Sequence, residues 1–345
     1  MSAADSRPPY RAGITGAGAA QGGRVVTSAE LGKRYDLSED WIVERTGVRE
    51  RRYLAEGERL VDLTARACGD ALAMAGRDAG EVELLLVATV SPDDLLPSQS
   101  VVTARRLDVP ETAVVADVNA ACTGFVTSLA HAAAMVESGR VGVALVCGAD
   151  ALSRVTDWED AKSAPLFGDG AGAVVVERVG EGRGFVGPVT GGHDEQRKAL
   201  HMTREEKNVI KMRGRQVYAN AVVRICEATQ RIVDEVGLTL DEVDMFVAHQ
   251  ANARILEAVA EKLELREDQL VHAIEDVGNT SAASIPIALA RAAATGRLSN
   301  GARAVLTGFG GGFVWSAIYV EFGPLGEGAA NAPAASEAAM TKERK

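Results

Sequence analysis

The sequence contains few aromatic residues, few cysteines and no long apolar run. Phe, Trp and Tyr make up only 4% of its 345 residues, and its four cysteines form no Cys-x-x-Cys pair. Neither a zinc site nor a disulfide framework is therefore indicated. No run of about 18 apolar residues exists, and the first ten residues lack the charged-then-apolar order of a secretory signal. We therefore expect a cytoplasmic protein with no membrane-spanning segment.

Positive charge is also scarce, because 37 Lys and Arg stand against 48 Asp and Glu, which gives a formal net charge of −11. General nucleic-acid binding needs a positive field that displaces counterions, so the charge argues against that class of function. An acidic protein partner would need a local basic patch. The 47% of hydrophobic residues are typical of a globular protein, and the length favours two domains of about 150 residues each.

Short apolar runs alternate with helix-period segments between residues 11 and 322, which is typical of an α/β protein. The runs are nearly continuous in Val, Leu and Ala, which indicates strands covered on both faces. Residues 1–10 and 323–345 are rich in Pro, Ala and Ser and are expected to be mobile tails. Strands are expected over 84–90, 113–118, 141–148, 171–177, 245–250, 303–309 and 316–322.

A repeat at large spacing links the two parts of the chain. Val87-Ala88-Thr89 and Val247-Ala248-His249 each end an expected strand and lie 160 residues apart. The same offset separates "VALVCGAD" (143–150) from "RAVLTGFG" (303–310). Two copies of a βαβ unit would bring corresponding loops to a common centre, so Cys122 would meet His249 and Asn279 there. The alternative is coincidence, because α/β chains yield similar segments by chance.

Cys122 lies where an apolar strand gives way to an alanine-rich helix, in "VVADVNAACTGFVTSLAHAAAMVESG" (114–139). At a helix N-terminus, unpaired N–H groups and the helix dipole lower the pKa of a thiol and make it a nucleophile. The alternative is a small buried hydrophobe. Cys68, Cys147 and Cys226 fit that alternative, since they lie inside helical or strand patterns.

Three further segments have two interpretations each. His249 emerges at a strand end, where α/β sites gather, but a lone histidine is more often structural. Asn279, in "EDVGNTSAASIPIALARA", is either a site residue or a helix cap. "GFGGGF" (308–313) brings backbone N–H groups close to a ligand or forms a simple turn. "GITGAGAAQGG" (13–23) has Gln21 in place of the last glycine of a dinucleotide loop, so a strand followed by a loop is expected there.

Four motifs, in order, closely resemble the β-ketoacyl-acyl carrier protein synthase III family of the thiolase superfamily: "NAACTGF", "VAHQANARI", "VGNTSAASIP" and "GFGGGFVWSA". "DWIVERTGVRERR" (40–52) and "FGDGAGAVV" (167–175) also match, so the resemblance covers about residues 11–322. It implies an α/β, thiolase-like, five-layered αβαβα fold built from two similar halves. The N-terminal half, 11–180, would carry the nucleophilic cysteine, and the C-terminal half, 181–322, the histidine and asparagine. The family is normally homodimeric.

The resemblance implies a decarboxylative condensation that starts a fatty-acid or polyketide chain and uses no metal or cofactor. Cys122 would take the acyl group from an acyl-CoA, while His249 and Asn279 would hydrogen-bond the thioester carbonyl of malonyl-acyl carrier protein. The backbone N–H groups of Cys122 and Gly311 would form the oxyanion hole. Contacts with coenzyme A are implied for Trp41, Arg45, Gly214 and Asn252. Docking of the acidic carrier protein is expected at Arg254, Lys211, Arg213 and Arg215.

Several residues depart from the family pattern. Leu96 stands where members carry a larger aromatic that reaches across the dimer to bound the acyl pocket, so we expect room for an acyl group other than acetyl. Ala161 and Lys162 replace an arginine near coenzyme A, and Leu37 replaces a polar residue near its adenine, so the side chains that the family uses there are absent.

Three other functions are compatible with the same fold. An acyltransferase would move the acyl group to a hydroxyl, amine or thiol without condensation, and it needs the cysteine and histidine but not Asn279. A degradative thiolase needs a second cysteine near the C-terminal glycine-rich loop, and "GFGGGF" has none. A non-catalytic partner subunit would lack the nucleophile.

Overall fold

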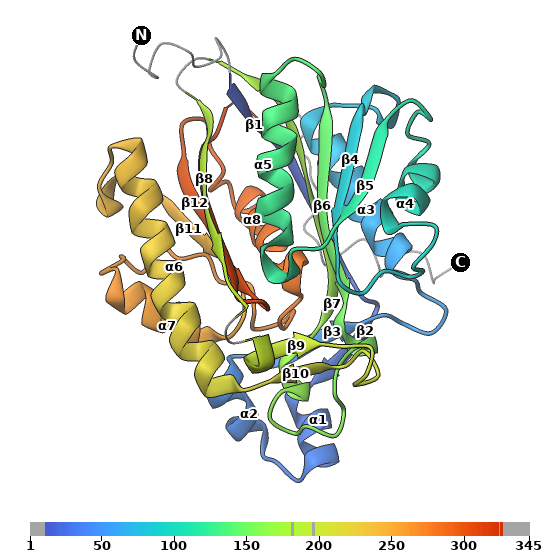
Figure 1. Cartoon of the computed structure of the whole chain (residues 1–345), viewed down its shortest axis with the longest axis vertical. Coiled ribbons are helices and arrows are strands. Elements are labelled where there is room, and N and C mark those ends of the chain that lie inside the picture. The colour runs from blue at the N-terminus through green and yellow to red at the C-terminus, as the bar shows by residue number, and fades with distance from the viewer. Residues whose placement is uncertain (1–10, 181–182, 195–196, 324, 327–345) are drawn as a thin grey trace.

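Two β-sheets, separated by a pair of central helices, form the core of the computed structural model, which describes residues 11–180, 183–194, 197–323 and 325–326 (Figure 1). The first sheet has the order β1 (Arg11–Gln21), β7 (Asp169–Val179), β6 (Ala144–Ala151), β4 (Leu84–Ala88) and β5 (Val114–Val118). The second has the order β11 (Met245–Ala248), β12 (Arg303–Gly310), β13 (Val314–Glu321) and β8 (Gly184–Gly192).

The strand directions are alike in the two sheets. β4 runs parallel to both β5 and β6, and β11 runs parallel to β12. The remaining neighbours are antiparallel. All strands of the first sheet come from residues 11–179 and all strands of the second from residues 184–321.

Helices complete the five layers that Figure 1 shows side by side. The central helices, α5 (Gly124–Glu137) and α8 (Ser284–Ala294), contact both sheets. α3 (Leu60–Ala75) and α4 (Gln99–Leu107) cover the outer face of the first sheet, while α6 (Gly214–Val236) covers the second and packs against α7 (Ala253–Lys262). This arrangement confirms the predicted αβαβα fold.

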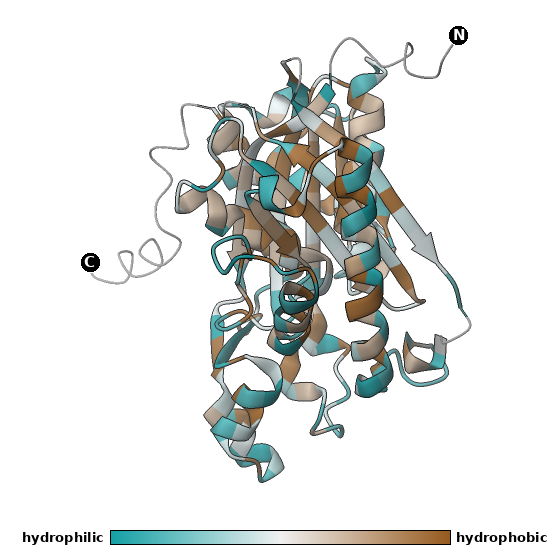
Figure 2. Cartoon of the chain, turned by 90° about the vertical axis from the view of Figure 1, so that its left-hand side faces the viewer, coloured by the Kyte–Doolittle hydropathy of each residue, from teal (hydrophilic) through white to brown (hydrophobic). Residues whose placement is uncertain are grey.

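The central layer is mostly apolar because most of its side chains pack between the two sheets. Phe125, Leu129, Ile285 and Leu289 are all buried in one cluster with residues of both sheets. A helix that is apolar all round is a buried helix. The outer helices differ, and Figure 2 shows hydrophilic segments along them in front of more hydrophobic strands.

The repeat predicted from the sequence has a structural counterpart. A 3₁₀ turn precedes each central helix, Ala121–Thr123 before α5 and Ser281–Ala283 before α8. Each turn begins with a residue in the left-handed region, Ala121 at φ 47° and Ser281 at φ 51°. The side-chain oxygen of Asn119 accepts the N–H of Ala121 at 3.4 Å, and that of Asn279 accepts the N–H of Ser281 at 2.9 Å. The offset of 160 residues is therefore real.

A smaller region lies at one end of the sheets (Figure 1). It contains β2 (Arg24–Thr27) paired with β3 (Glu50–Tyr53), and β9 (Leu200–Met202) paired with β10 (Ile210–Met212). Helices α1 (Ser28–Tyr35) and α2 (Glu39–Thr46) connect β2 to β3. The sequence did not indicate these short strands, nor the edge strand β8, whose glycines and Pro188 are unfavourable in strand interiors.

The two expected tails, 1–10 and 323–345, lie mostly outside the described residues. Only residues 323, 325 and 326 of the second tail are described. Leu325 packs against the central core cluster, and the Gly326 N–H lies 3.4 Å from the carbonyl oxygen of Thr15. Within the described ranges, no helix is both long and apolar enough to cross a membrane.

Candidate active site

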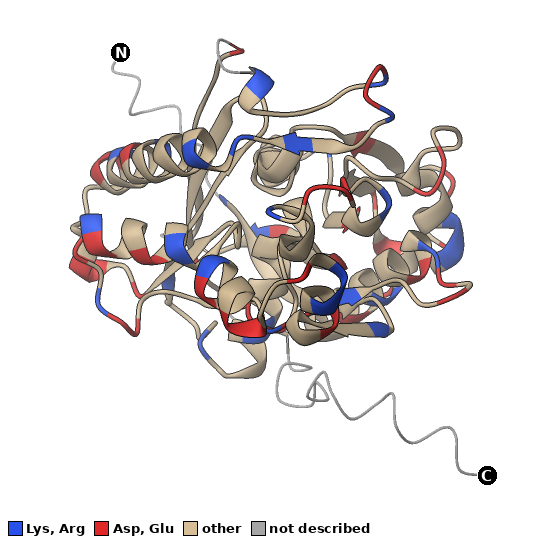
Figure 3. Ribbon diagram, turned by 90° about the horizontal axis from the view of Figure 1, so that it is seen from below, with Lys and Arg blue, Asp and Glu red and all other residues tan. Residues whose placement is uncertain are grey.

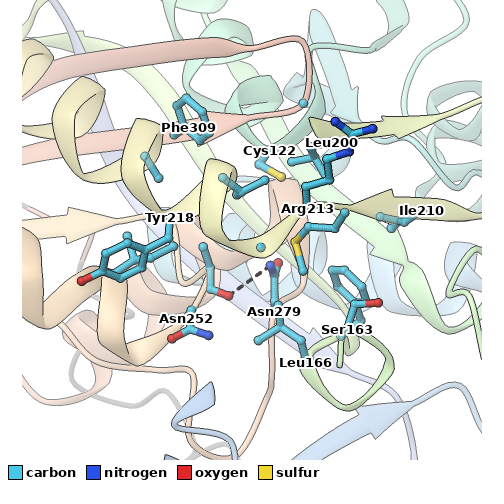
Figure 4. Close-up of a pocket in the computed structure, with 18 of the residues that line it drawn as sticks. Cys122, Ser163, Leu166, Leu200, Ile210, Arg213, Tyr218, Asn252, Asn279 and Phe309 are labelled. Carbon is cyan, nitrogen blue, oxygen red and sulfur yellow. Dashed lines mark hydrogen bonds between the residues drawn. The ribbon is translucent and has the colours of Figure 1, made fainter. Parts of the chain in front are cut away.

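Residues from both halves line a cavity of about 1090 Å³ near the ends of the central helices. Cys122, His249 and Asn279 all face it, so the structure brings the three predicted site residues together. Figure 4 shows Cys122, Leu200 and Asn279 among the residues that line this cavity.

Cys122 is the middle residue of the 3₁₀ turn directly before α5, as the strand-to-helix pattern predicted. The prediction of a lowered thiol pKa is wrong for this resting state. Burial raises the pKa of Cys122 to about 11, and the nearby Asp150 carboxylate acts in the same direction. The Ser281 hydroxyl, 3.6 Å from the sulfur, acts in the opposite direction but does not offset the loss of water.

His249 follows β11 and is 2% exposed. Its Nδ1 forms a 2.6 Å hydrogen bond with the Ser284 hydroxyl, which also accepts the N–H of Gln250 at 3.2 Å. Burial lowers the pKa of His249 to about 4, so the imidazole is neutral at pH 7. We assign the ring proton to Nε2, because the Ser284 hydroxyl can donate its hydrogen to Nδ1 while its oxygen accepts from Gln250. A neutral ring of this tautomer is a hydrogen-bond donor.

Asn279 lines the cavity and also bonds to the turn before α8. Its Oδ1 accepts the N–H of Ser281, the first residue of the 3₁₀ turn, while the cap position of that turn is Thr280. Its Nδ2 donates to the carbonyl oxygen of Ala251 at 3.3 Å (dashed in Figure 4). An amide nitrogen has two hydrogens, so a second donor remains for a group in the cavity.

The glycine-rich loop closes the space around Cys122. A Cβ on Gly310 would lie 2.8 Å from the Cys122 backbone nitrogen, so only glycine permits this approach of β12 to the nucleophile. Gly311, predicted as an oxyanion-hole residue, lines the cavity.

The four residues expected to contact coenzyme A also line the cavity. The Arg45 guanidinium lies 4.3 Å from the centroid of the Trp41 ring, and both belong to α2. Asn252 caps α7 and donates to the carbonyl oxygen of Arg45 at 2.9 Å. Gly214 begins α6. Leu37, by contrast, packs in an apolar cluster beside Trp41.

Three of the four residues expected to dock the carrier protein, Arg213, Arg215 and Arg254, line the cavity together with other basic residues, and Lys211 is not among the lining residues. Five lining residues are basic, and one, Asp160, is acidic. Lys211 differs from the rest because its ammonium pairs with the Asp157 carboxylate. Figure 3, drawn from below, shows basic and acidic segments interspersed over that end of the molecule. The basic lining residues are Arg45, Lys162, Arg213, Arg215 and Arg254.

Leu96 does not line the cavity of its own chain. It lies in the segment before α4 and is 88% exposed, beside Leu95 at 83%. The contact that the family resemblance implies for this position is with the acyl pocket of a partner subunit, so it is not a contact within one chain.

Sequence reasoning missed Ser281, Ser284 and Asp150 as functional candidates. Ser284 holds the ring of His249, and Ser281 contacts Cys122. Both stand in "NTSAASIP", where only Asn279 was considered as a site residue. The 160-residue repeat was the available signal for Ser281, since it aligns with Ala121 beside the nucleophile.

Comparison with known proteins assigns the chain to a family. Residues 116–193 match the sequence model described as 3-oxoacyl-[acyl-carrier-protein (ACP)] synthase III, and residues 233–322 match the C-terminal model of the same synthase. The chain is 40% identical over 311 residues to the β-ketoacyl-[acyl-carrier-protein] synthase III of Oceanobacillus iheyensis, covering 90% of this chain and 99% of that protein. It is 41% identical over 312 residues to that of Geobacillus kaustophilus, with the same coverage.

Solved structures agree. The 3-oxoacyl-[acyl-carrier-protein] synthase III of Aquifex aeolicus VF5 matches with a TM-score of 0.87 and 35% identity, covering 90% of this chain and all of that one. The priming β-ketosynthase of the R1128 polyketide biosynthetic pathway matches with a TM-score of 0.87 and 32% identity, covering 92% and 98%. The fold, the converging site and these matches together show that this chain belongs to the β-ketoacyl-acyl carrier protein synthase III family.

Proposed function

We propose that the chain condenses an acyl-CoA starter with malonyl-acyl carrier protein, with loss of carbon dioxide, and so initiates a fatty-acid or polyketide chain. The observation that carries this proposal is the convergence of Cys122, His249 and Asn279 on one cavity. Relatives named for the same reaction, and a structural neighbour named as a polyketide priming ketosynthase, support it.

In the first half-reaction, the sulfur of Cys122 attacks the thioester carbon and coenzyme A leaves as its thiol. The carbonyl oxygen gains negative charge as the carbon becomes tetrahedral. Backbone N–H groups of Cys122 and Gly311 are our candidates for stabilising that charge. Trp41 and Arg45 lie on the same cavity and suit the adenine and phosphate parts of coenzyme A.

In the second half-reaction, malonyl-acyl carrier protein loses carbon dioxide and its thioester oxygen acquires enolate charge. His249, neutral and with its proton on Nε2, and the free amide hydrogen of Asn279 supply two donors to that oxygen. Preorganised donors of this kind contribute roughly 3–4 kcal/mol each. The carbanion then attacks the acyl-cysteine, and the sulfur of Cys122 is released.

We further propose that the active enzyme is a homodimer. β5 is the edge strand of the first sheet, and Val114 on it is 51% exposed. Leu95 and Leu96 are exposed as well. Unpaired sheet edges and exposed large apolar side chains mark protein contacts, and the family resemblance implies that a partner covers this side.

Acylation of Cys122 tests the proposal. After incubation with a set of acyl-CoAs, the peptide containing Cys122 should gain the mass of the acyl group, and addition of malonyl-acyl carrier protein should release carbon dioxide. Cys122→Ala should lose the adduct. Cys226→Ala, which changes a buried cysteine of α6 outside the cavity, should keep it. Asn279→Ala should load normally but condense poorly.

The alternatives give different results in the same experiment. Normal acylation without carbon dioxide release would favour the acyltransferase that transfers to a hydroxyl, amine or thiol. No adduct with any acyl-CoA would favour a non-catalytic subunit.

A further inference from the structure

Asp150 is a buried carboxylate for which the condensation described above has no role. It lies near the end of β6 and is fully buried. Its Oδ1 accepts hydrogen bonds from the Thr89 hydroxyl at 3.1 Å, the Val90 N–H at 2.8 Å and the Ser91 hydroxyl at 2.7 Å. Burial raises the pKa of Asp150, while these three donors act in the opposite direction and fix the orientation of the carboxyl.

The other side of the Asp150 carboxyl meets the second half of the chain. Oδ2 accepts the N–H of Ala282 at 3.3 Å, and the carboxyl also hydrogen-bonds with the Ser281 hydroxyl. The same hydroxyl lies 3.6 Å from the sulfur of Cys122, within hydrogen-bonding distance for sulfur. Ser281 thus stands between the buried carboxylate and the reacting atom.

The backbone holds Ser281 in this position. Its φ of 51° lies in the left-handed region, and its N–H is bonded to Asn279. A Cβ on Gly148 would lie 2.1 Å from the carbonyl oxygen of Ala282, so the turn rests directly on the backbone of β6. At the equivalent position of the first half stands Ala121, which has no hydroxyl.

A hydroxyl has one hydrogen, so Ser281 donates either to Asp150 or to Cys122. While Cys122 is a neutral thiol, the carboxylate is the stronger acceptor, and the thiol hydrogen can be donated to the Ser281 oxygen. When the thiol has lost its proton, the sulfur is charged and the Ser281 hydrogen can stabilise it. We propose that Ser281 is a further catalytic residue, which donates to Asp150 at rest and to the sulfur of Cys122 during acylation, with Asp150 as its positioning residue.

The charged groups around Cys122 determine how substitutions of Ser281 and Asp150 should change the reactivity of its thiol. Among the described residues, the charge that acts on the Cys122 thiol is that of Asp150 on β6, and His249, after β11, lines the same cavity. β12 contributes glycine backbone, and the 3₁₀ turn before α8 contributes Ser281. His249 is neutral above about pH 4. Removing the Ser281 hydroxyl and removing the Asp150 charge should therefore change the reactivity of the thiol in opposite directions.

Alkylation of Cys122 by iodoacetamide, a small neutral reagent, tests this between about pH 6 and 10, below the thiol pKa of about 11, where the rate follows the small thiolate fraction. The rate is read from the mass of the Cys122 peptide. Ser281→Ala should slow alkylation about tenfold at a fixed pH below the thiol pKa, because the thiolate loses a hydrogen bond. Asp150→Asn should accelerate it, because a nearby negative charge and a competing acceptor are both removed. In the Ser281→Ala background, the acceleration by Asp150→Asn should be smaller.

Two matched variants separate reactivity from stability. Ser128→Ala removes a buried serine hydroxyl that bonds within α5, and Asp169→Asn neutralises a buried carboxylate bonded to Ser153 and Leu54. Both should leave the alkylation profile of Cys122 unchanged. An unchanged profile in Ser281→Ala, or slower alkylation in Asp150→Asn, would overturn the proposal. If Asp150→Asn does not fold, Ser281→Ala, which removes one oxygen atom, decides alone.

The proposal rests on Cys122 being the acylated residue of the proposed function, but its test needs neither acyl-CoA nor carrier protein. A failed condensation assay with the expected alkylation pattern would therefore refute the function and not the role of Ser281.

Discussion

At the residue scale, burial controls the ionisation of the cavity groups. The pKa of His249 is about 4 in the folded chain against 6.5 for an ordinary histidine, because the imidazole is withdrawn from water. The unfolded chain therefore binds a proton between these values that the folded chain does not. Stability is unaffected by this group above about pH 6.5 and decreases as the pH falls toward 4.

His249→Gln should remove that dependence. Between pH 7 and pH 5, the wild-type chain should lose about 2 kcal/mol of unfolding free energy more than the variant, since 1.5 pH units lie below the unfolded pKa. Urea unfolding of both proteins at each pH measures the difference, and the other titrating groups cancel in the comparison. Parallel pH dependences would show that His249 is charged in the folded state.

The residues of the site were predictable from sequence only where a motif contains them. Cys122, His249 and Asn279 each had a structural alternative, and the family motifs with the 160-residue repeat brought them together. The direction of the Cys122 pKa was not predictable in this way, because it depends on burial by residues distant in sequence. Asp150 escaped notice for the same reason, since its partners come from residues 89–91 and 281–282.

At the element scale, a buried arginine joins the paired strands β2 and β3 to the segment before β7 of the first sheet. Arg51 on β3 is fully buried and donates to the carbonyl oxygens of Val26 at 3.2 Å and Pro165 at 2.6 Å, and to the Ser28 hydroxyl at 3.0 Å. These partners belong to β2, α1 and the segment before β7. No local sequence pattern indicates such a contact, which explains why β2 and β3 were not predicted.

Arg51→Ala should lower the unfolding free energy by about 3–5 kcal/mol, because it opens a cavity and leaves three buried acceptors without a donor. Arg49→Ala, two residues earlier in the chain, is the matched control. The side chains of Arg49 and Glu275 form an ion pair and are both more than half exposed, so this pair should contribute less than about 1 kcal/mol to the unfolding free energy. Urea unfolding compares them. Equal small losses would mean that water replaces the guanidinium of Arg51.

At the scale of the whole molecule, duplication explains why the site lies where it does. The two 3₁₀ turns contact each other and each faces the end of the opposite half, Gly310 against Cys122 and Asp150 against Ala282. In the proposed reaction, one half supplies the nucleophile and the other supplies the donors for the enolate. The five layers were predicted through the resemblance to the family, whereas the apolar strands and the 160-residue repeat indicated only an α/β chain with two similar units.

The exposed segment before α4 provides the last prediction, which joins the proposed dimer to substrate choice. If Leu96 reaches the acyl pocket of a partner, Leu96→Phe should narrow that pocket and reduce Cys122 acylation by long acyl-CoAs about tenfold or more, while acetyl-CoA loads normally. Leu95→Phe is the matched control, because Leu95 is nearly as exposed and adjacent in sequence. Acylation rates are read by mass, and light scattering verifies that both variants have the wild-type oligomeric state. An identical chain-length profile in the two variants would mean that Leu96 lies on a surface away from the acyl group, and the size of the pocket would then be set by residues of its own chain.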